Sequence, residues 1–300
     1  MTQRLKNLLS IDQLSRDSIV DILKAAAAFK KKPPSSNLLA GKIILNAFFE
    51  NSTRTRLSFE MAAKRLGGGT ISFSEAESSI AKGETFRDTI FNLTAFHPNT
   101  IVLRHSQSGA SEEAQRLAGA IPVINAGDGR HEHPTQALLD AMTMLEHHRS
   151  LKGLHVGIVG DITNSRVARS NMILLKKMGA RVTVCGPKTM LPSHVEQYGV
   201  KVTTDLKKLV PTVDVIMMLR IQIERGVENS IPSVGDYAKR YQLNSSLMKI
   251  AKPHAIVMHP GPMNRGVEIS SNVADCPQSV ILRQAENGVF VRMAVLRAIL

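Results

Sequence analysis

The sequence predicts an α/β protein of two domains, each with a central, mostly parallel sheet flanked by helices. Three observations support this fold class. Short runs rich in β-branched residues alternate with helical patterns along the whole chain, as in parallel sheets whose strands are connected by helices. The length of 300 residues suits two domains of ordinary size. A composition of 43% hydrophobic and 21% charged residues is that of a globular protein with a sizeable core.

Four apolar runs predict strands in the first half of the chain, with helical patterns between them. The clearest helix covers 53–66 and ends at Gly67, Gly68 and Gly69, because glycine readily adopts the left-handed backbone found just after helices. The predicted strands are 42–49, 70–74, 100–105 and 121–126.

The second half of the chain repeats this alternation. A helical pattern over 165–178 stops at Gly179 and separates the first two apolar runs. We therefore expect a second α/β unit with its own sheet. The predicted strands are 154–160, 181–186, 214–219 and 254–259.

Two further helical patterns indicate how the domains are organised. The segment 134–149 predicts a linker helix, because Pro134 suits a first helical turn and apolar residues recur on one face. The closing segment, 284–300, predicts a helix that packs back on the first domain. The expected organisation is a first domain at 1–133 joined by 284–300, a linker helix at 134–149 and a second domain at 150–283.

Charge and hydropathy exclude several classes of partner. The formal net charge is +13, but basic residues are scattered among acidic ones, and the one short basic run at 30–32 is typical of a solvated helix end. We therefore expect no nucleic-acid partner. No apolar stretch approaches the roughly 20 residues that cross a bilayer, and the first residues lack the pattern of a signal peptide. We expect a cytoplasmic protein with no membrane partner.

Few residues are available for a disulfide or a metal site. Cys185 and Cys276 are too few for a disulfide framework or a thiolate metal site, and we expect both to be buried, unreactive thiols. His131 and His133 lie a residue apart, a spacing that metal ligands can have, but no third ligand is convincingly spaced. We expect neither a metal nor another cofactor.

Polar residues repeatedly follow the predicted strands. Ligands of open parallel sheets bind beyond the carboxyl ends of the strands, so this placement predicts a binding site at that edge of each sheet. Random surface charge would not select that end so regularly. The residues concerned are 52–55, Arg104, 127–136, 161–166, Arg220, Gln222 and 259–262.

The stretch FFENSTRTRLSFE at 48–60 gives the clearest chemical signal. A helix that begins near Thr53 presents unpaired backbone N–H groups and the positive end of its dipole, which together suit a phosphate. The hydroxyls of Ser52 and Thr55 add donors, and the guanidinium of Arg54 matches phosphate oxygens. The alternative, that Ser52 is only the helix N-cap, needs a single hydroxyl and does not explain the arginine.

Two other classes of protein match part of the pattern. The strand, turn and helix at 155–171 are similar to a dinucleotide site, but Gly157 and Gly160 do not form G-x-G-x-x-G, and no acidic residue ends the next strand. A non-catalytic protein that binds small anions is the second alternative. Loss of an essential donor would favour it, yet every position of the motifs described next is filled.

Six stretches together resemble the aspartate and ornithine carbamoyltransferases. The stretch at 48–60 resembles their carbamoyl-phosphate signature, and five further motifs bring the resemblance to nearly the whole chain. It implies transfer of a carbamoyl group from carbamoyl phosphate, which the first domain would bind. The other motifs are KGET at 82–85, HPTQALLD at 133–140, GDITNSRVARSN at 160–171, RIQIER at 220–225 and HPGPMNRGVEI at 259–269.

Two stretches resemble the aspartate members of the family more than the ornithine members. Ornithine enzymes usually carry a cysteine in an HCLP stretch, where this sequence has HPGP, and a Ser-Met-Gly loop, where it has RIQIER. The SVG at 233–235 lies too far along and lacks the methionine. The implied reaction is carbamoylation of the α-amino group of L-aspartate, bound by the second domain, to N-carbamoyl-L-aspartate in pyrimidine biosynthesis. Ornithine carbamoyltransferase is the alternative.

The resemblance also implies roles for single residues. Catalytic roles are implied for Arg54, Thr55, Lys82, Arg104 and His133. Binding of carbamoyl phosphate is implied for Ser52, Thr53, Arg54, Thr55, Ser79, Arg104, His133, Gln136, Pro260, Gly261 and Pro262. Binding of aspartate is implied for Lys82, Arg166, Arg220 and Gln222.

A polar loop at 78–85 bears on assembly. Taken by itself it is a flexible loop, but in the family it reaches into the active site of a neighbouring subunit. The resemblance therefore implies a homotrimer with shared sites, in which Lys82 and either Ser78 or, as we favour, Ser79 contact the substrates. Glu50 and Arg225 resemble the family's ion-pair partners in domain closure. The sequence leaves open whether regulatory chains or other enzymes of the pathway bind.

Overall fold

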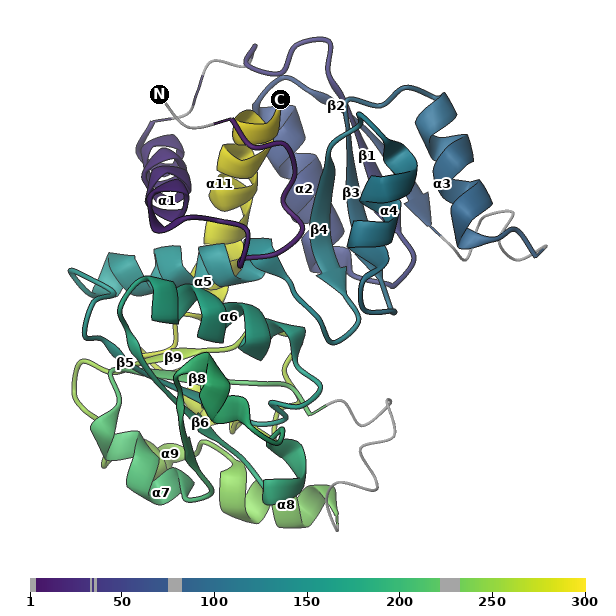
Figure 1. Ribbon diagram of the computed structural model, residues 1–300. Coiled ribbons are helices and arrows are strands. Elements are labelled where there is room, and N and C mark those ends of the chain that lie inside the picture. Colours follow the sequence, from purple (N-terminus) through teal and green to yellow (C-terminus); the bar gives the residue numbers. More distant parts are fainter. Residues whose placement is uncertain (1–3, 33, 35–36, 75–82, 222–232) are drawn as a thin grey trace. The chain divides into compact units, whose positions relative to one another are not determined.

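The computed structural model describes residues 4–32, 34, 37–74, 83–221 and 233–300 (Figure 1). The chain divides into two compact units, the first formed by Met1–Met142 and Ala285–Leu300 and the second by Thr143–Gln284. The boundaries fall inside helices α5 (Pro134–His147) and α11 (Ile281–Ile299). The second unit is therefore inserted between two parts of the first.

The first unit contains a four-stranded sheet in the order β2-β1-β3-β4, and all of its strand pairs are parallel. The strands agree with the predicted runs to within about two residues, and the largest difference is in β4, which extends to Asp128. Their bounds are β1 (Ile43–Phe48), β2 (Gly69–Ser74), β3 (Thr100–His105) and β4 (Val123–Asp128).

Helices cover both faces of this sheet (Figure 1). Leu45 and Ala47 of β1 join a buried cluster with residues of α3 and α4, and the residues between them point to the opposite face because side chains alternate along a strand. Figure 1 shows α1, α2 and α11 on that opposite side. The helices are α1 (Arg16–Lys31), α2 (Thr53–Arg65), α3 (Phe86–Ala95) and α4 (Ala110–Ala118).

The second unit contains a five-stranded parallel sheet in the order β7-β6-β5-β8-β9. Figure 1 shows α6 on one face and α7, α8 and α9 on the other. The strands are β5 (His155–Val159), β6 (Arg181–Cys185), β7 (Lys201–Thr203), β8 (Val215–Met218) and β9 (Ile256–Met258). The helices are α6 (Arg166–Lys177), α7 (Leu206–Leu209), α8 (Val234–Tyr241), α9 (Ser245–Met248) and α10 (Ser271–Ala274), with short 3₁₀ turns at Lys188–Met190, Val195–Tyr198 and Val210–Thr212.

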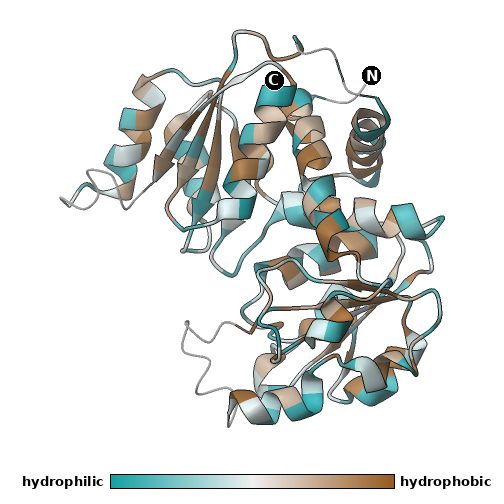
Figure 2. Cartoon of the chain, turned by 180° about the vertical axis from the view of Figure 1, so that it is seen from behind, coloured by the Kyte–Doolittle hydropathy of each residue, from teal (hydrophilic) through white to brown (hydrophobic). Residues whose placement is uncertain are grey.

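The predicted fold class, two α/β domains with parallel sheets, is confirmed by these two units. The strands of the first sheet are largely brown, the apolar colour, in Figure 2, as expected of a sheet buried on both faces. Within the described ranges, no helix is both long and apolar enough to cross a membrane.

Each sheet has one point at which the strand order reverses, and such points form crevices for ligands at the carboxyl ends of the strands. In the first sheet the chain leaves β1 toward β2 on one side, and β3 lies on the other side of β1. In the second sheet β6 and β8 flank β5 in the same way. The residues that follow β1 and β3, and those that follow β5 and β8, therefore lie where a ligand is expected.

Candidate active site

The start of α2 is the segment where the sequence predicts an anion site. Ser52 occupies the N-cap position, but its side chain makes no cap hydrogen bond, and the first turn carries no acidic residue. By contrast, Ser15 and Thr85 cap α1 and α3 by accepting from a backbone N–H. The Ser52 side chain therefore does not act as the helix cap, and its role in anion binding stays a prediction. The first N–H groups of α2 have no side-chain cap, and they carry the partial positive charge of the helix end.

The hydroxyl groups at this helix start hold one another in place. Ser52 Oγ donates to Thr55 Oγ1 at 2.9 Å, and Ser58 Oγ donates to the carbonyl of Thr55 at 2.9 Å. Thr55 is buried, whereas Thr53 and Arg54 are exposed. One face of the helix start is therefore fixed, and the other carries the exposed residues Thr53 and Arg54.

Arg104 lies at the carboxyl end of β3, on the other side of the reversal point from α2. Its guanidinium donates to the carbonyl of Ala126 at 3.1 Å and pairs with Glu50 at 3.2 Å. Phe49 continues the pairing of β1 with β3, because its N–H donates to the carbonyl of Arg104. Only 9% of Arg104 is exposed, so its side chain is held close to the segment that leads into Ser52. Glu50 therefore pairs with Arg104, while Arg225, its expected partner, lies outside the described residues.

The loop from β4 to α5 is built around the buried carboxylate of Asp128. Its Oδ2 accepts from the N–H of Gly109 at 2.8 Å and contacts His131 Nδ1 at 3.1 Å. Its Oδ1 accepts from Asn125 Nδ2 and from the N–H of Glu132. The hydrogen bond to Asp128 raises the pKa of His131 above its ordinary 6.5. These bonds fix the loop that leads directly to His133.

Gly129 in this loop has no room for a side chain. Its φ of +48° is left-handed, and a Cβ would overlap the backbone nitrogen of Ser108. The loop consequently follows one path to His133, which is 4% exposed and whose carbonyl accepts from the N–H of Gln136 in the first turn of α5. His133 and Gln136 thus lie at the helix start where the sequence placed them.

In the second unit, Arg166 is the first residue of α6 and follows β5. The preceding loop is fixed by Asp161, which accepts from the N–H and from the side-chain amide of Asn164, and by Ser165, which caps the helix. Arg166 is 8% exposed. Arg220 follows β8, the neighbour of β5 in the sheet, and is half-buried. The two guanidinium groups therefore lie at the carboxyl ends of adjacent strands.

The HPGP turn follows β9 in the same unit. His259 Nδ1 accepts from the N–H of Gly261 at 2.8 Å, which makes Nε2 the protonated nitrogen, and Nε2 lies 3.1 Å from Glu268 Oε1. Both side chains are fully buried. This arrangement holds the backbone of Pro260 and Gly261, whose residues are half-buried, while Pro262 is exposed.

The predicted site residues fall into three groups. Ser52, Thr53, Arg54, Thr55, Arg104, His133 and Gln136 follow β1, β3 and β4 in the first unit. Arg166, Arg220, Pro260, Gly261 and Pro262 follow β5, β8 and β9 in the second. Ser78, Ser79, Lys82 and Gln222 lie outside the described residues. The sequence analysis included Asp128 in the range 127–136 and Asp140 in the motif at 133–140 but gave neither an individual role. Asp140 is one helical turn from Gln136, a spacing that could have indicated contact.

Neither cysteine is part of this arrangement. Cys185 is buried as predicted, and burial raises the pKa of its thiol to about 12. Cys276 is only half-buried, so the prediction of two buried thiols is wrong for that residue. The described part of the chain contains no group of three or more His, Cys, Asp or Glu side chains arranged to hold a metal ion.

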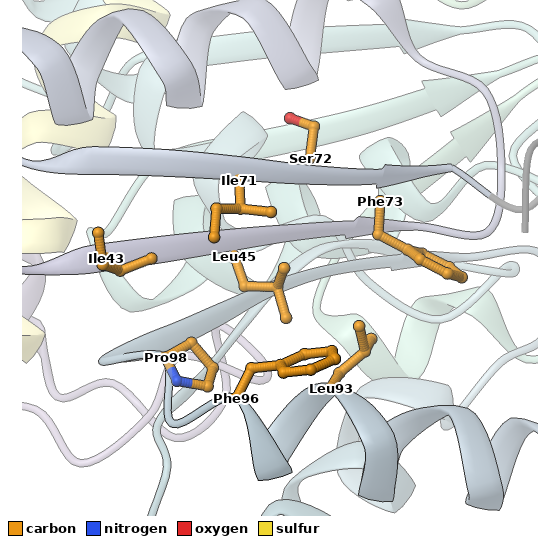
Figure 3. A pocket seen from close by; sticks show the side chains of 8 residues that line it. All are labelled: Ile43, Leu45, Ile71, Ser72, Phe73, Leu93, Phe96 and Pro98. Atoms are coloured by element: carbon orange, nitrogen blue, oxygen red, sulfur yellow. The ribbon is translucent and has the colours of Figure 1, made fainter.

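An apolar pocket of about 240 Å³ lies between the edge strand β2, the start of β1 and the end of α3 (Figure 3). Ser72 is the one hydroxyl residue among its lining residues, so the pocket offers little to an anion. It is separate from the polar strand ends. The lining residues are Ile43, Leu45, Ile71, Ser72, Phe73, Leu93, Phe96 and Pro98.

Two family models match the chain, one in each half. Residues 6–146 match the carbamoyl-P binding domain of aspartate/ornithine carbamoyltransferases, and residues 152–299 match the Asp/Orn binding domain. The chain belongs to the aspartate/ornithine carbamoyltransferase family, and the resemblance on which the sequence analysis depended is confirmed.

Curated relatives and solved structures agree with the aspartate branch. An aspartate carbamoyltransferase catalytic subunit of Syntrophotalea carbinolica is 53% identical over 298 residues, covering 97% of this chain and 94% of its own. One from Solibacter usitatus is 52% identical and covers 98% of both chains. The structure of aspartate transcarbamoylase from Trypanosoma cruzi in complex with carbamoyl phosphate and aspartate is 34% identical, with a TM-score of 0.89 and coverage of 100% of this chain and 98% of that one. These relatives do not favour the ornithine alternative.

Proposed function

We propose that this chain transfers the carbamoyl group of carbamoyl phosphate to the α-amino group of L-aspartate and releases phosphate. The observation that carries the proposal is the start of α2, where N–H groups without a side-chain cap adjoin Ser52, Thr53 and Arg54. Membership of the family and the names of the relatives support the choice of carbamoyl phosphate and aspartate as substrates.

The phosphate of the donor substrate binds at this helix start. A helix N-terminus with hydroxyl groups and a guanidinium supplies several charge-assisted hydrogen bonds to phosphate oxygens. Arg104, held by Glu50 and by a backbone carbonyl, lies on the other side of the reversal point and adds a second guanidinium. Phosphate is also the leaving group, so the same positive charges stabilise it as it departs.

Attack by the amine places negative charge on the carbamoyl oxygen, and Thr55, Arg104 and His133 polarise that oxygen. Donors that are positioned before the reaction stabilise such a charge by about 3–4 kcal/mol each. The Ser52–Thr55 hydrogen bond and the Asp128 loop that leads to His133 position two of the three donors. A new C–N bond forms, the bond from carbon to the phosphate oxygen breaks, and the departing phosphate accepts a proton from the amine.

The carbamoyl amide and the second substrate contact other loops. Gln136 and the backbone carbonyls of Pro260, Gly261 and Pro262 accept hydrogen bonds from the carbamoyl NH₂ group. The two aspartate carboxylates bind guanidinium groups. The residues that hold aspartate are Arg166, Arg220, Gln222 and Lys82.

Replacement of Arg54 with alanine tests the phosphate role. It should abolish turnover and leave the chain folded, because Arg54 is exposed and Thr55 still anchors the helix start. Near-normal activity with carbamoyl phosphate would refute the role. Assays of aspartate against ornithine as acceptors test the substrate assignment, and a preference for ornithine would overturn the roles of Arg220 and Gln222.

The active assembly is a homotrimer with shared sites, in which Ser79 and Lys82 of one subunit reach the substrates of the next. The surface next to this segment supports association of copies. β2 is an edge strand, and edge strands with apolar side chains favour association. Ile71 and Phe96 beside the apolar pocket are 55% and 77% exposed (Figure 3), and the segment 75–82 follows β2 directly.

A mixing experiment tests the shared site. Chains with Lys82→Ala and chains with Arg54→Ala should each be inactive, and mixed trimers should regain some activity because part of their sites receives both native residues. Co-assembled trimers without activity would contradict the shared site. Phe96→Asp should disperse the trimer in sedimentation, whereas the same change at exposed Leu282, remote from β2 along the chain, serves as control.

The proposed reaction belongs to pyrimidine biosynthesis and takes place in the cytoplasm. Its product, N-carbamoyl-L-aspartate, would pass to the next enzyme of that pathway. Regulatory chains or other enzymes of the pathway are candidate partners, and co-purification from cells would identify them.

A further inference from the structure

Gln136 donates to a buried carboxylate, which fixes the direction of its amide. We propose that Asp140 is a positioning residue that turns the carbonyl oxygen of Gln136 toward the donor substrate. The site then demands an N–H donor on the transferred group, and favours carbamoyl phosphate over acyl phosphates such as acetyl phosphate. This inference rests on the proposed function.

The geometry on α5 determines which end of the amide faces Asp140. Gln136 Nε2 donates to Asp140 Oδ1 at 2.9 Å, across the one-turn spacing at which helical side chains meet. Asp140 is fully buried, and Gln136 is 8% exposed. An ionised carboxylate only accepts hydrogen bonds, so the NH₂ group faces Asp140 and the carbonyl oxygen forms the other end. No described residue donates a hydrogen bond to that oxygen.

A buried cation, Arg292, interacts electrostatically with Asp140. Arg292 of α11 is 4% exposed, and its guanidinium lies 5.0 Å from the centre of the Phe59 ring. Gly288 one turn earlier leaves the room that Arg292 occupies, because a Cβ there would come within 2.5 Å of Arg292 Nη1. Burial lowers the pKa of Arg292 to about 9, and attraction to Asp140 opposes that fall, so Arg292 is charged at neutral pH.

The orientation has a consequence for selectivity. A carbamoyl group presents N–H donors to the oxygen of Gln136, whereas an acetyl group presents a methyl group and leaves that oxygen without a partner. Sites built to hydrogen-bond a substrate discriminate strongly against analogues that lack the group, and for a single acceptor we expect about 10-fold or more. Inorganic phosphate has no acyl group, so its affinity should not depend on the orientation of the Gln136 amide.

The test is Asp140→Asn, assayed for the KM of carbamoyl phosphate and for inhibition by acetyl phosphate and by inorganic phosphate. With asparagine at 140 the amide of Gln136 can turn either way, so the KM should rise several-fold. The preference for carbamoyl phosphate over acetyl phosphate should narrow, and inhibition by inorganic phosphate should be unchanged. Glu146→Gln is the matched control, an acid-to-amide change at an exposed position of the same helix, and should leave all three constants unchanged.

Two further variants keep the proposal falsifiable. Asp140→Asn leaves Arg292 without its counter-charge, so Asp140→Asn with Arg292→Met removes both charges and should show the same loss of selectivity in a folded chain. In a Gln136→Ala background, Asp140→Asn should change the selectivity no further. The inference would be overturned if Asp140→Asn lowered the selectivity equally in the presence and absence of Gln136. It would also be overturned if Asp140→Asn left the preference for carbamoyl phosphate over acetyl phosphate unchanged. If the unaltered chain failed to use carbamoyl phosphate, the proposed function would fail instead.

Discussion

Asp214 joins three segments at the amino end of the second sheet, and its replacement by asparagine should measure what that junction contributes. The carboxylate accepts from the N–H of His155 at 2.9 Å, from Lys252 Nζ at 2.6 Å and from His254 Nε2 at 3.2 Å. His155 is the first residue of β5, Lys252 and His254 precede β9, and Asp214 precedes β8. Asparagine has the same shape but no charge.

The pKa of Asp214 sets the expected magnitude. Burial alone would raise it, but the hydrogen bonds from Lys252, from the N–H of His155 and from His254 outweigh burial and hold it at about 2 instead of 3.8. At about 1.36 kcal/mol per pH unit this difference corresponds to roughly 2.4 kcal/mol. The Asp214 side chain is 16% exposed and its cationic partners more so, so we expect screening to reduce the contribution to about 1–2 kcal/mol.

The sign of the pH dependence follows from the lowered pKa. The stabilisation is fully present above the pKa of the unfolded chain, near 3.8, and is lost as pH falls through about 2. Urea unfolding should therefore show Asp214→Asn less stable by about 1–2 kcal/mol at pH 7, with about half of that difference left at pH 3. Glu196→Gln, at an exposed position of the same unit, is the control. A difference that stays constant from pH 7 to pH 3 would show that charge is not the cause.

Three other predictions concern the candidate site and the cores. Gly129→Ala should abolish activity and lower stability by about 2 kcal/mol or more in urea unfolding. Gly109→Ala, at a left-handed backbone conformation with open space for a Cβ, should cost only about 1 kcal/mol. Ser52→Ala should raise the KM for carbamoyl phosphate but destabilise the fold by less than about 0.5 kcal/mol, because the Ser52 side chain makes no cap hydrogen bond. Ser15→Ala removes a side-chain cap and should cost about 1 kcal/mol. Equal losses of stability in the two variants would show that Ser52 acts as a cap. Cys185 should resist iodoacetamide at pH 8 until the chain unfolds, as peptide mass spectrometry would show.

The strands that carry the site were predictable because their signal is local. The run 100–105 begins with Thr100, Ile101, Val102 and Leu103, which are β-branched or apolar and fully buried, as is typical of strands that are covered on both faces of a parallel sheet. The polar residues that follow each run therefore predict a binding site at that edge of the sheet. β7 (Lys201–Thr203) was missed because its three residues are partly exposed at the edge of a sheet and lack an apolar pattern.

Side-chain relations across long stretches of sequence were not predictable. The charge of Arg292 reaches Asp140 only because α11 returns to the first unit, and no local pattern connects two residues so far apart. The orientation of the Ser52 hydroxyl could not be predicted from the sequence either. A serine before a helix usually caps it, and only the position of Thr55 Oγ1 shows that the hydrogen bond goes elsewhere.

The insertion of one unit within the other has a consequence for biosynthesis. On the ribosome, the second unit emerges before residues 285–300, which complete the first core. Ala298 accepts from the N–H of Leu5, Asn287 accepts from Lys30, and Phe290 lies against Arg65. The core of the first unit therefore stays incomplete, with part of its apolar surface exposed, until translation is nearly finished. We expect chaperone binding during synthesis to concentrate on the first half of the nascent chain.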